Sequence, residues 1–381
     1  MDFEFNEQQK MFQAAVREFC QKEMGPLADE YDLKGEFPRD IIMPKAGKLG
    51  YNLITCPKEY GGAEMTLLEQ MILNEEAARV SLGLAESYCL GAYSVAPAVW
   101  TFGTKAQCEK YIPPTMRGEW ISALSLTEHS GGSDPANRMT NAVRKNGKWV
   151  VNGSNIFITN GGICDYQWIL AWTDKTKKPS QGMTSFVIDW PTKGWSRKSL
   201  NKMGSRSSDE AEVFYDDMEL TDDNVLGTVG RGLPMFLWVV AQGRACHSAR
   251  SVGCAQSAFD YALDYTKQRV VWGQPISRHQ NISFKFAEMA VEIEAARTLV
   301  YKTGWKYVRG DQDAARYSAM AKLFAEEMNM RVARACMEMF GCYGLMLDNR
   351  AQRFYRDAAC LMITEGTPAM LKMVINRPFN L

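Results

Sequence analysis

The chain has 381 residues, of which 46% are hydrophobic and 23% charged, a balance that is typical of folded globular proteins and excludes a disordered chain. Basic and acidic residues number 44 each, so the zero net charge does not favour nucleic acid or an anionic membrane as a partner. The chain opens without a signal-like segment, and its apolar runs are too short to span a bilayer, so we expect a cytoplasmic protein with no membrane span.

Apolar residues recur at helical spacing up to about residue 117, for example Phe12, Val16 and Phe19, which predicts an N-terminal helical domain over 1–117. Residues 118–229 form short runs rich in β-branched and aromatic side chains, bounded by turn residues, which predicts a β-domain. Within it, Asn146-Gly147 predicts a hairpin turn.

Long helical stripes return over 230–381 and predict a packed helical bundle. One expected face contains Phe286, Met289 and Ile293, and another contains Tyr317 and Phe324. Ten cysteines occur singly and three histidines lie far apart, so we expect free thiols, no metal site and no histidine-based catalytic triad.

The glycine-rich segments do not match the common nucleotide-binding loops, but one of them could bind a pyrophosphate. Gly227–Gly232 lacks the spacing of a dinucleotide-binding loop, and the sequence contains neither a P-loop nor a nucleophile elbow. Ser125–Asp134 follows a predicted strand and combines adjacent glycines with serines. Its exposed N–H groups suit a pyrophosphate, although an ordinary polar turn would have the same composition.

Five ordered segments across about 240 residues make the chain resemble the acyl-CoA dehydrogenases. The resemblance implies an α+β fold with an N-terminal helical domain, a middle β-barrel or sheet domain and a C-terminal four-helix bundle. It also implies a homotetramer that dehydrogenates an acyl-CoA, contains FAD and passes electrons to an electron-transfer flavoprotein. The segments are Thr127-Glu128 with Gly132–Asp134, Val151–Gly162, Lys202–Ser208, Arg269–Gly273 with His279-Gln280, and Arg356-Asp357 with Thr364–Thr367.

The resemblance implies two groups of cofactor residues, one at the flavin and one at the ADP half of a neighbouring subunit's FAD. Several positions depart from the usual family pattern, namely His129-Ser130, Phe157, Glu338, Cys342 and Ala369. The flavin group comprises Leu124, Leu126, Thr127, Ser133, Phe157 and Thr159, with Thr159 near N5, and Thr367 contacts the pyrophosphate. The ADP group comprises Arg269, Gln280, Glu338, Gly341 and Cys342.

Glu365 matches the catalytic carboxylate of the family, a general base that takes the α-proton while the flavin takes the β-hydride. It precedes Thr367, a good N-cap, and Pro368, which suits the first position of a helix. Some relatives carry the base at the position of Gly243, which has no carboxylate here. The resemblance implies acyl-CoA contacts at Ser133, Ala241, Arg244, Gly366, Glu86 and Tyr88.

The acyl group is expected to be neutral and short, branched or alicyclic. Ser81–Trp100, which shapes the acyl site in the family, contains aromatic residues and Glu86 but no Lys or Arg to pair with a distal carboxylate. Glu86 is expected to face solvent; the alternatives are contact with a cationic acyl tail or a role as second base. Alternative activities are an enoyl-CoA reductase of the crotonobetainyl-CoA type, an oxygen-using flavin enzyme and a flavin-free scaffold.

Overall fold

The structure is a computed structural model that describes residues 4–379, and its first part is helical. Three helices begin at a residue whose side chain accepts a backbone N–H, with Gln or Glu three positions later completing the cap: Asn6, Thr66 and Thr104. The helices are α1 (Glu7–Phe19), α2 (Ala28–Lys34), α3 (Arg39–Lys48), α4 (Leu67–Val80), α5 (Leu82–Tyr93), α6 (Val95–Phe102) and α7 (Lys105–Arg117).

An eight-stranded sheet follows, in the order β6-β7-β3-β2-β4-β5-β8, with β1 paired in parallel to β4. The predicted hairpin turn joins β2 to β3: Asn146 and Gly147 both have positive φ, and Lys145 pairs with Lys148. The strands are β1 (Ser122–Ser125), β2 (Asn141–Lys145), β3 (Lys148–Thr159), β4 (Tyr166–Trp172), β5 (Met183–Asp189), β6 (Trp195–Ser199), β7 (Glu210–Leu220) and β8 (Val225–Leu226), with the short helix α8 (Pro179–Gly182) before β5.

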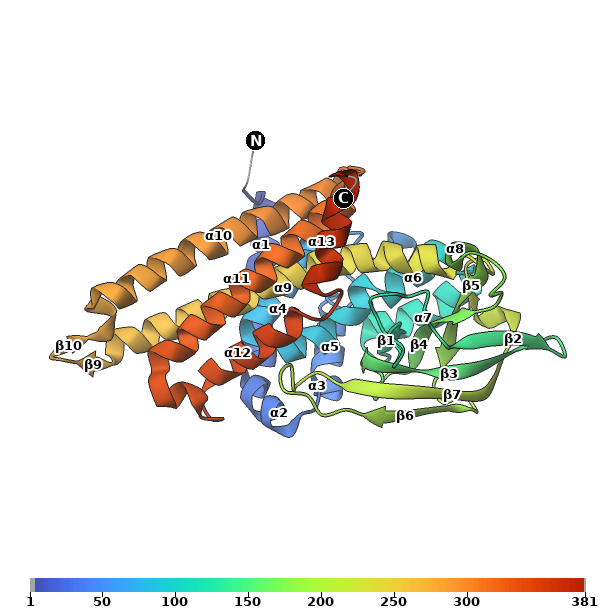
Figure 1. Ribbon diagram of the computed structural model, residues 1–381, viewed down its shortest axis with the longest axis horizontal. Helices are drawn as coiled ribbons and strands as arrows, with labels where there is room; N and C mark the ends of the chain where they lie inside the picture. The colour runs from blue at the N-terminus through green and yellow to red at the C-terminus, as the bar shows by residue number, and fades with distance from the viewer. Residues whose placement is uncertain (1–3, 380–381) are drawn as a thin grey trace.

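The third part is a bundle of long helices that lies beside the sheet domain. Figure 1 shows α9, α10 and α11 running along the helical half of the molecule, with the β9–β10 hairpin at the end far from the sheet. The elements are α9 (Gly232–Gln268), β9 (Val270–Val271), β10 (Gln274–Pro275), α10 (Gln280–Val308), α11 (Ala314–Phe340), α12 (Arg350–Leu361) and α13 (Pro368–Asn376).

Helix α9 connects the two halves because it contributes to two separate cores. Its first turns place Phe236 against Trp168 of β4, whereas Val252 further along joins the core shared with α4 and α11. The predicted face of α11 is only partly correct, because Tyr317 and Phe324 are half-buried. The buried residues of α11 include five alanines, whose small side chains allow close packing against α9.

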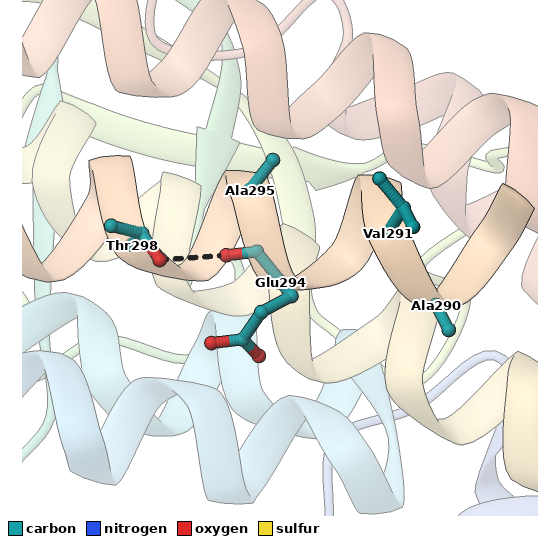
Figure 2. Close-up of a pocket in the computed structure, with 5 residues that line it drawn as sticks. All are labelled: Ala290, Val291, Glu294, Ala295 and Thr298. Carbon is teal, nitrogen blue, oxygen red and sulfur yellow. Dashed lines mark hydrogen bonds between the residues drawn. The ribbon is translucent and has the colours of Figure 1, made fainter. Parts of the chain in front are cut away.

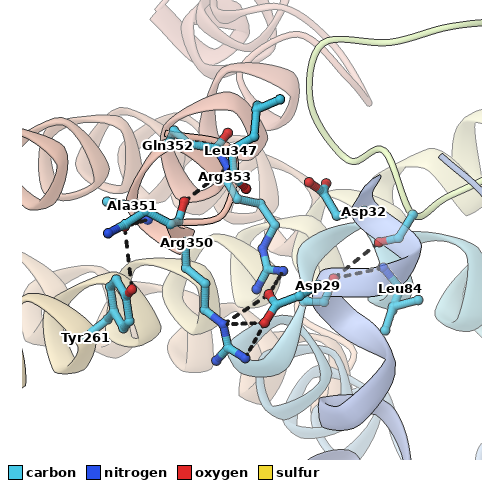
Figure 3. A network of polar contacts seen from close by, with 12 residues as sticks. Asp29, Asp32, Leu84, Tyr261, Leu347, Arg350, Ala351, Gln352 and Arg353 are labelled. Carbon is cyan, nitrogen blue, oxygen red and sulfur yellow. Dashed lines mark hydrogen bonds and ion pairs between the residues drawn. The ribbon is translucent and has the colours of Figure 1, made fainter. Parts of the chain in front are cut away.

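Helix α12 is fixed by ion pairs to the N-terminal domain (Figure 3). Arg350 and Arg353 both contact the carboxylate of Asp29, at 2.7 and 2.5 Å, and Arg356 contacts Asp32 at 2.7 Å. Because α12 leads directly into the loop 362–367, these contacts set the position from which that loop starts.

Candidate active site

Glu365 lies in the short loop between α12 and α13, in a left-handed backbone conformation with φ of 53°. As predicted, Thr367 caps α13 by accepting the N–H of Met370, and Pro368 occupies the first turn. A non-glycine residue with positive φ is strained unless its surroundings hold it. The contacts that hold this loop come from α9 and α11.

Two cations hold the loop by its carbonyl groups. Arg244 Nε donates to the carbonyl oxygen of Glu365 at 3.1 Å. Lys322 Nζ donates to the carbonyl oxygens of Leu361 and Gly366, at 3.4 and 3.2 Å, and so joins the end of α12 to the residue after Glu365. The loop is therefore held at both ends by side chains from other helices.

Lys322 has a carboxylate partner of its own, Glu326, whose Oε2 lies 2.6 Å from Nζ. Both side chains are almost completely buried. Burial lowers the pKa of Lys322 and raises the pKa of Glu326 to about 8, while the attraction between the two charges opposes both shifts. The pair therefore places a buried cation against the loop, with Glu326 as its counter-charge.

The Glu365 carboxyl group is largely buried, with 15% of the side chain exposed. Burial raises its pKa, against the attraction of Arg244, Arg250 and Lys322. The position of Gly243 adjoins it, since a Cβ added there would lie 3.2 Å from Glu365 Oε1. The carboxyl group therefore combines a raised pKa with remaining access, which suits a general base.

His247 of α9 lies beside Glu365, with Nε2 3.6 Å from Oε1. Burial lowers the pKa of His247 well below its usual value, and the charges of Arg250 and Lys322 lower it further, so the imidazole is neutral. Its Nε2 also lies 3.4 Å from the hydroxyl group of Tyr93, to which Arg250 Nη2 donates at 3.0 Å. Successive polar contacts thus connect Glu365 to His247, Tyr93 and Arg250.

Glu86 is buried, with 7% exposed, so the expectation that it faces solvent is wrong. Helix α5 is apolar on all sides and is covered by other elements around its whole circumference, which carries Glu86 inward. Its charge acts on Arg250 and on Glu210. Ser81–Trp100 itself contains no Lys or Arg, but α9 brings Arg250 close enough for the charge of Glu86 to act on it.

The residues predicted at the flavin lie around the end of β1 and along β3. Phe157 has a positive φ and the residue is 64% exposed, whereas Thr159 is half-buried. Thr159 Oγ1 donates to the carboxylate of Glu210 at 3.3 Å. Burial raises the pKa of Glu210 to about 7, despite Lys202 at 3.5 Å. The other predicted residues here are half-buried or exposed: Leu124, Leu126, Thr127 and Ser133.

The residues predicted at the ADP half are far from the sheet in the same chain. Arg269 and Gln280 flank the β9–β10 hairpin, at the opposite end of the molecule from β3 (Figure 1). Glu338 lies in the last turn of α11 and pairs with Lys285 at 3.0 Å. These residues are exposed, as are Gly341 and Cys342. One chain therefore does not bring the two predicted halves of the FAD site together.

The remaining predicted substrate residues are placed differently from one another. Arg244 and Gly366 lie at the Glu365 loop, and the carbonyl group of Ala241 accepts the hydroxyl of Ser318 at 2.6 Å. Tyr88 is buried and donates to the carbonyl oxygen of Tyr51 at 3.1 Å, so its hydroxyl group points toward the segment that follows α3. Ser133 is exposed in the loop after β1.

The described residues contain no second candidate for a catalytic or metal site. A depression on α10 is lined by three apolar residues, the hydroxyl residue Thr298 and one carboxylate, Glu294, and offers no catalytic combination (Figure 2). Residues 4–379 contain no cluster of His, Cys, Asp and Glu able to hold a metal ion. Among those same residues, none of the helices has the length and apolarity required to cross a bilayer.

Sequence reasoning missed His247, Arg250, Lys322, Glu326 and Glu210. A signal existed for one pair, because Lys322 and Glu326 are four residues apart in a helix and so share a face. However, a Lys and a Glu at this spacing usually lie on a solvent-exposed helix face, so the spacing alone did not indicate a buried ion pair. The other three join the site only through packing between distant segments.

Comparison with known proteins covers almost the whole chain. The N-terminal, middle and C-terminal domain models of acyl-CoA dehydrogenases match residues 6–119, 123–218 and 230–379. A short-chain-specific acyl-CoA dehydrogenase of Clostridium acetobutylicum is 36% identical over 99% of both chains. The caffeyl-CoA reductase-Etf complex subunit CarC of Acetobacterium woodii is 34% identical over 98% of both. Butyryl-CoA dehydrogenase from Megasphaera elsdenii superposes with a TM-score of 0.95 at 33% identity, covering 100% of both chains.

Proposed function

Because the chain belongs to the acyl-CoA dehydrogenase family of flavoprotein oxidoreductases, we propose that Glu365 is the base that removes the α-proton of an acyl-CoA thioester. The observation that carries this proposal is the Glu365 loop, in which a carboxyl group of raised pKa is held from both sides by Arg244 and Lys322. We also propose that the three domains span 1–117, 118–229 and 230–381.

The residues around β1 and β3 fit an FAD. The exposed ring of Phe157 offers a flat apolar surface that an isoalloxazine would cover, and the hydroxyl group of Thr159 is placed to reach its polar edge. Leu124, Leu126, Thr127 and Ser133 would complete the flavin site, with Thr367 at the pyrophosphate. Arg269, Gln280, Glu338, Gly341 and Cys342 would hold the ADP half of a neighbour's FAD. When bound, the flavin supplies a hydride acceptor.

The chain's own groups would prepare the substrate for proton loss. In residues 4–379 the backbone N–H groups of Glu365 and Gly366 find no hydrogen-bond acceptor, so they can donate to a thioester carbonyl oxygen. Such donation stabilises the negative charge that develops when the α-proton leaves. Arg244 adds positive charge at the same loop, and Ser133, Ala241 and Glu86 complete the proposed acyl-CoA site.

We also propose the direction of the reaction and the kind of acyl group that the substrate has. We expect dehydrogenation of a neutral short, branched or alicyclic acyl-CoA, with electrons passing to an electron-transfer flavoprotein. Operation as an enoyl-CoA reductase is the second candidate, because one similar protein is the caffeyl-CoA reductase subunit. The purified protein should be yellow, and a panel of acyl-CoA and enoyl-CoA thioesters, assayed with artificial electron acceptors and donors, tests both directions. Rapid reoxidation by air would favour an oxygen-using enzyme.

The pH dependence of turnover is expected to report Glu365. The base must be deprotonated, so kcat/KM should fall as pH drops through its raised pKa, at a higher pH than for an exposed glutamate, which titrates near about 4.3. The charge of Arg244 lowers this pKa. Arg244→Met should therefore move the acid limb to higher pH, whereas Arg334→Met, at an exposed surface pair, should not. An acid limb that stays in place in R244M would argue against this assignment.

The active form is expected to be a homotetramer. Large apolar side chains are exposed at the hairpin tip and along α10: Trp272 is 89% exposed, Val291 70% and Phe284 57%. Light scattering should give a mass near four chains. Trp272→Asp should yield smaller species with less bound FAD, while Val143→Asp, exposed on the sheet, should change neither. A flavin-loaded, active monomer would refute the shared site.

A further inference from the structure

Arg250 is a buried cation without a carboxylate partner. Only 1% of the residue is exposed, and no carboxylate of residues 4–379 lies within 4.0 Å of its guanidinium group. Its one hydrogen bond is from Nη2 to the hydroxyl group of Tyr93, at 3.0 Å, and its Nε has no acceptor. A buried guanidinium is ordinarily paired or fully hydrogen-bonded, because its desolvation is costly. The guanidinium group of Arg250 therefore keeps N–H donors that no group of the described residues accepts.

His247 also lacks a hydrogen-bond partner, at Nδ1. Since Tyr93 accepts from Arg250, its own proton can point to His247 Nε2, 3.4 Å away, which leaves the proton of the imidazole on Nδ1. Nδ1 is buried and has no acceptor in the described chain. The other tautomer leaves Nδ1 with an unused lone pair. In either arrangement His247 Nδ1 and Arg250 Nε stay without a hydrogen-bond partner among the described residues.

This polar cluster, Tyr93, His247 and Arg250, starts at the proposed base. His247 Nε2 lies 3.6 Å from Glu365 Oε1, and a Cβ at Gly243 would touch both Glu365 and the Tyr93 ring at 3.2 Å. An acyl group that presents its α-carbon to Glu365 therefore places its more distant carbons next to the cluster. A saturated aliphatic group would leave the cluster's donors unpaired.

The charges of Glu86 and Arg250 indicate which kind of substrate group could bind at the cluster. Glu86 is buried close enough to raise the pKa of Arg250 through its charge, and among residues 4–379 it forms no ion pair or hydrogen bond. One cation and one carboxylate already balance there. An added carboxylate would meet Glu86, while an uncharged oxygen could accept from Arg250 or Tyr93 without that repulsion.

We propose that Tyr93 and Arg250 bind an uncharged oxygen, a hydroxyl or a carbonyl, on the acyl group, so that the substrate is a neutral oxygenated acyl-CoA. This inference depends on the proposed function, because it takes Glu365 to mark the α-carbon. The oxygen lies a few bonds beyond the α-carbon, which for an alicyclic acyl group means ring position 3 or 4. The cluster then determines specificity rather than performing the chemistry.

The test compares matched ring thioesters in the flavin-loaded enzyme: cyclohexane-1-carbonyl-CoA and its 3- and 4-hydroxy, 3- and 4-oxo, and 3- and 4-carboxy derivatives. The wild-type kcat/KM should be at least about tenfold higher for a hydroxy or oxo thioester than for the unsubstituted ring, because a site built around hydrogen bonds rejects an analogue that lacks them. A preference for the unsubstituted or a carboxylated ring would overturn the proposal.

Tyr93→Phe should bring the ratio of kcat/KM between the oxygenated and the unsubstituted thioester close to one, whatever the change in absolute rate. Arg250→Met should lower the same ratio if it folds, with a change in absolute rate as well because the Arg250 charge acts on Glu365, and Y93F alone decides if it does not fold. Tyr261→Phe is the matched control, since this hydroxyl lies on α9 and contacts Asn349 at 3.5 Å. Equal loss on both substrates in Y93F would show a merely structural role. Failure of the proposed function looks different: no thioester would then be converted at all.

Discussion

Replacing Glu365 with Gln is expected to lower kcat by on the order of 10³-fold or more, the size of effect seen when a general base and its charge are lost. Glutamine keeps the shape of the side chain but cannot accept the α-proton. The loop should keep its position, because Arg244 and Lys322 contact backbone carbonyl groups rather than the carboxylate. Single-turnover reduction of the flavin by the best thioester of the panel measures the effect.

The matched control for this variant is Glu294→Gln, an exposed glutamate on α10 whose carboxylate pairs with Arg297 at 3.2 Å. It should retain wild-type turnover. E365Q should also retain the visible flavin spectrum and the thermal midpoint of the wild type. Turnover within tenfold of the wild type in E365Q would assign the proton transfer to another group, and the neutral His247 would be the next to replace.

Much of the fold could be predicted because its signals are local. Asn146-Gly147 specifies its hairpin turn through the positive φ that both residues adopt, and Thr367 with Pro368 specifies the start of α13. The succession of helical, strand-rich and helical segments follows from the change of hydrophobic period along the chain. Only local pattern and the resemblance were needed to place Glu365 immediately before that helix.

The environment of Glu365 could not be predicted in the same way. Arg250 and Lys322 precede it by 115 and 43 residues, and only the packing of α9 and α11 against the loop brings their charges to it. Buried charges in helices look like solvated ones when only spacing is available. Ser81–Trp100 shows the consequence, since Glu86 is the one charged residue in that stretch and the cation near it, Arg250, comes from α9.

The second large effect is expected from Lys322→Met. Removing one partner of a buried ion pair typically costs about 3–5 kcal/mol, because the other charge stays buried and unpaired. Here the remaining group would be Glu326, which is 1% exposed. The thermal midpoint should fall clearly below that of the wild type. Lys148→Met is the control: its partner Glu219 lies 2.6 Å away on the surface, and its loss should barely move the midpoint.

A double variant separates this stability effect from the positioning of the base. In Lys322→Met with Glu326→Leu both charges are gone and the volume is apolar, so much of the lost stability should return. The carbonyl groups of Leu361 and Gly366 would still lack their donor, and the left-handed conformation of Glu365 would still lack that support. Turnover should therefore stay low in a well-folded protein. A double variant that regained both stability and wild-type kcat would show that Lys322 only neutralises Glu326, and that Arg244 alone is enough to hold the loop.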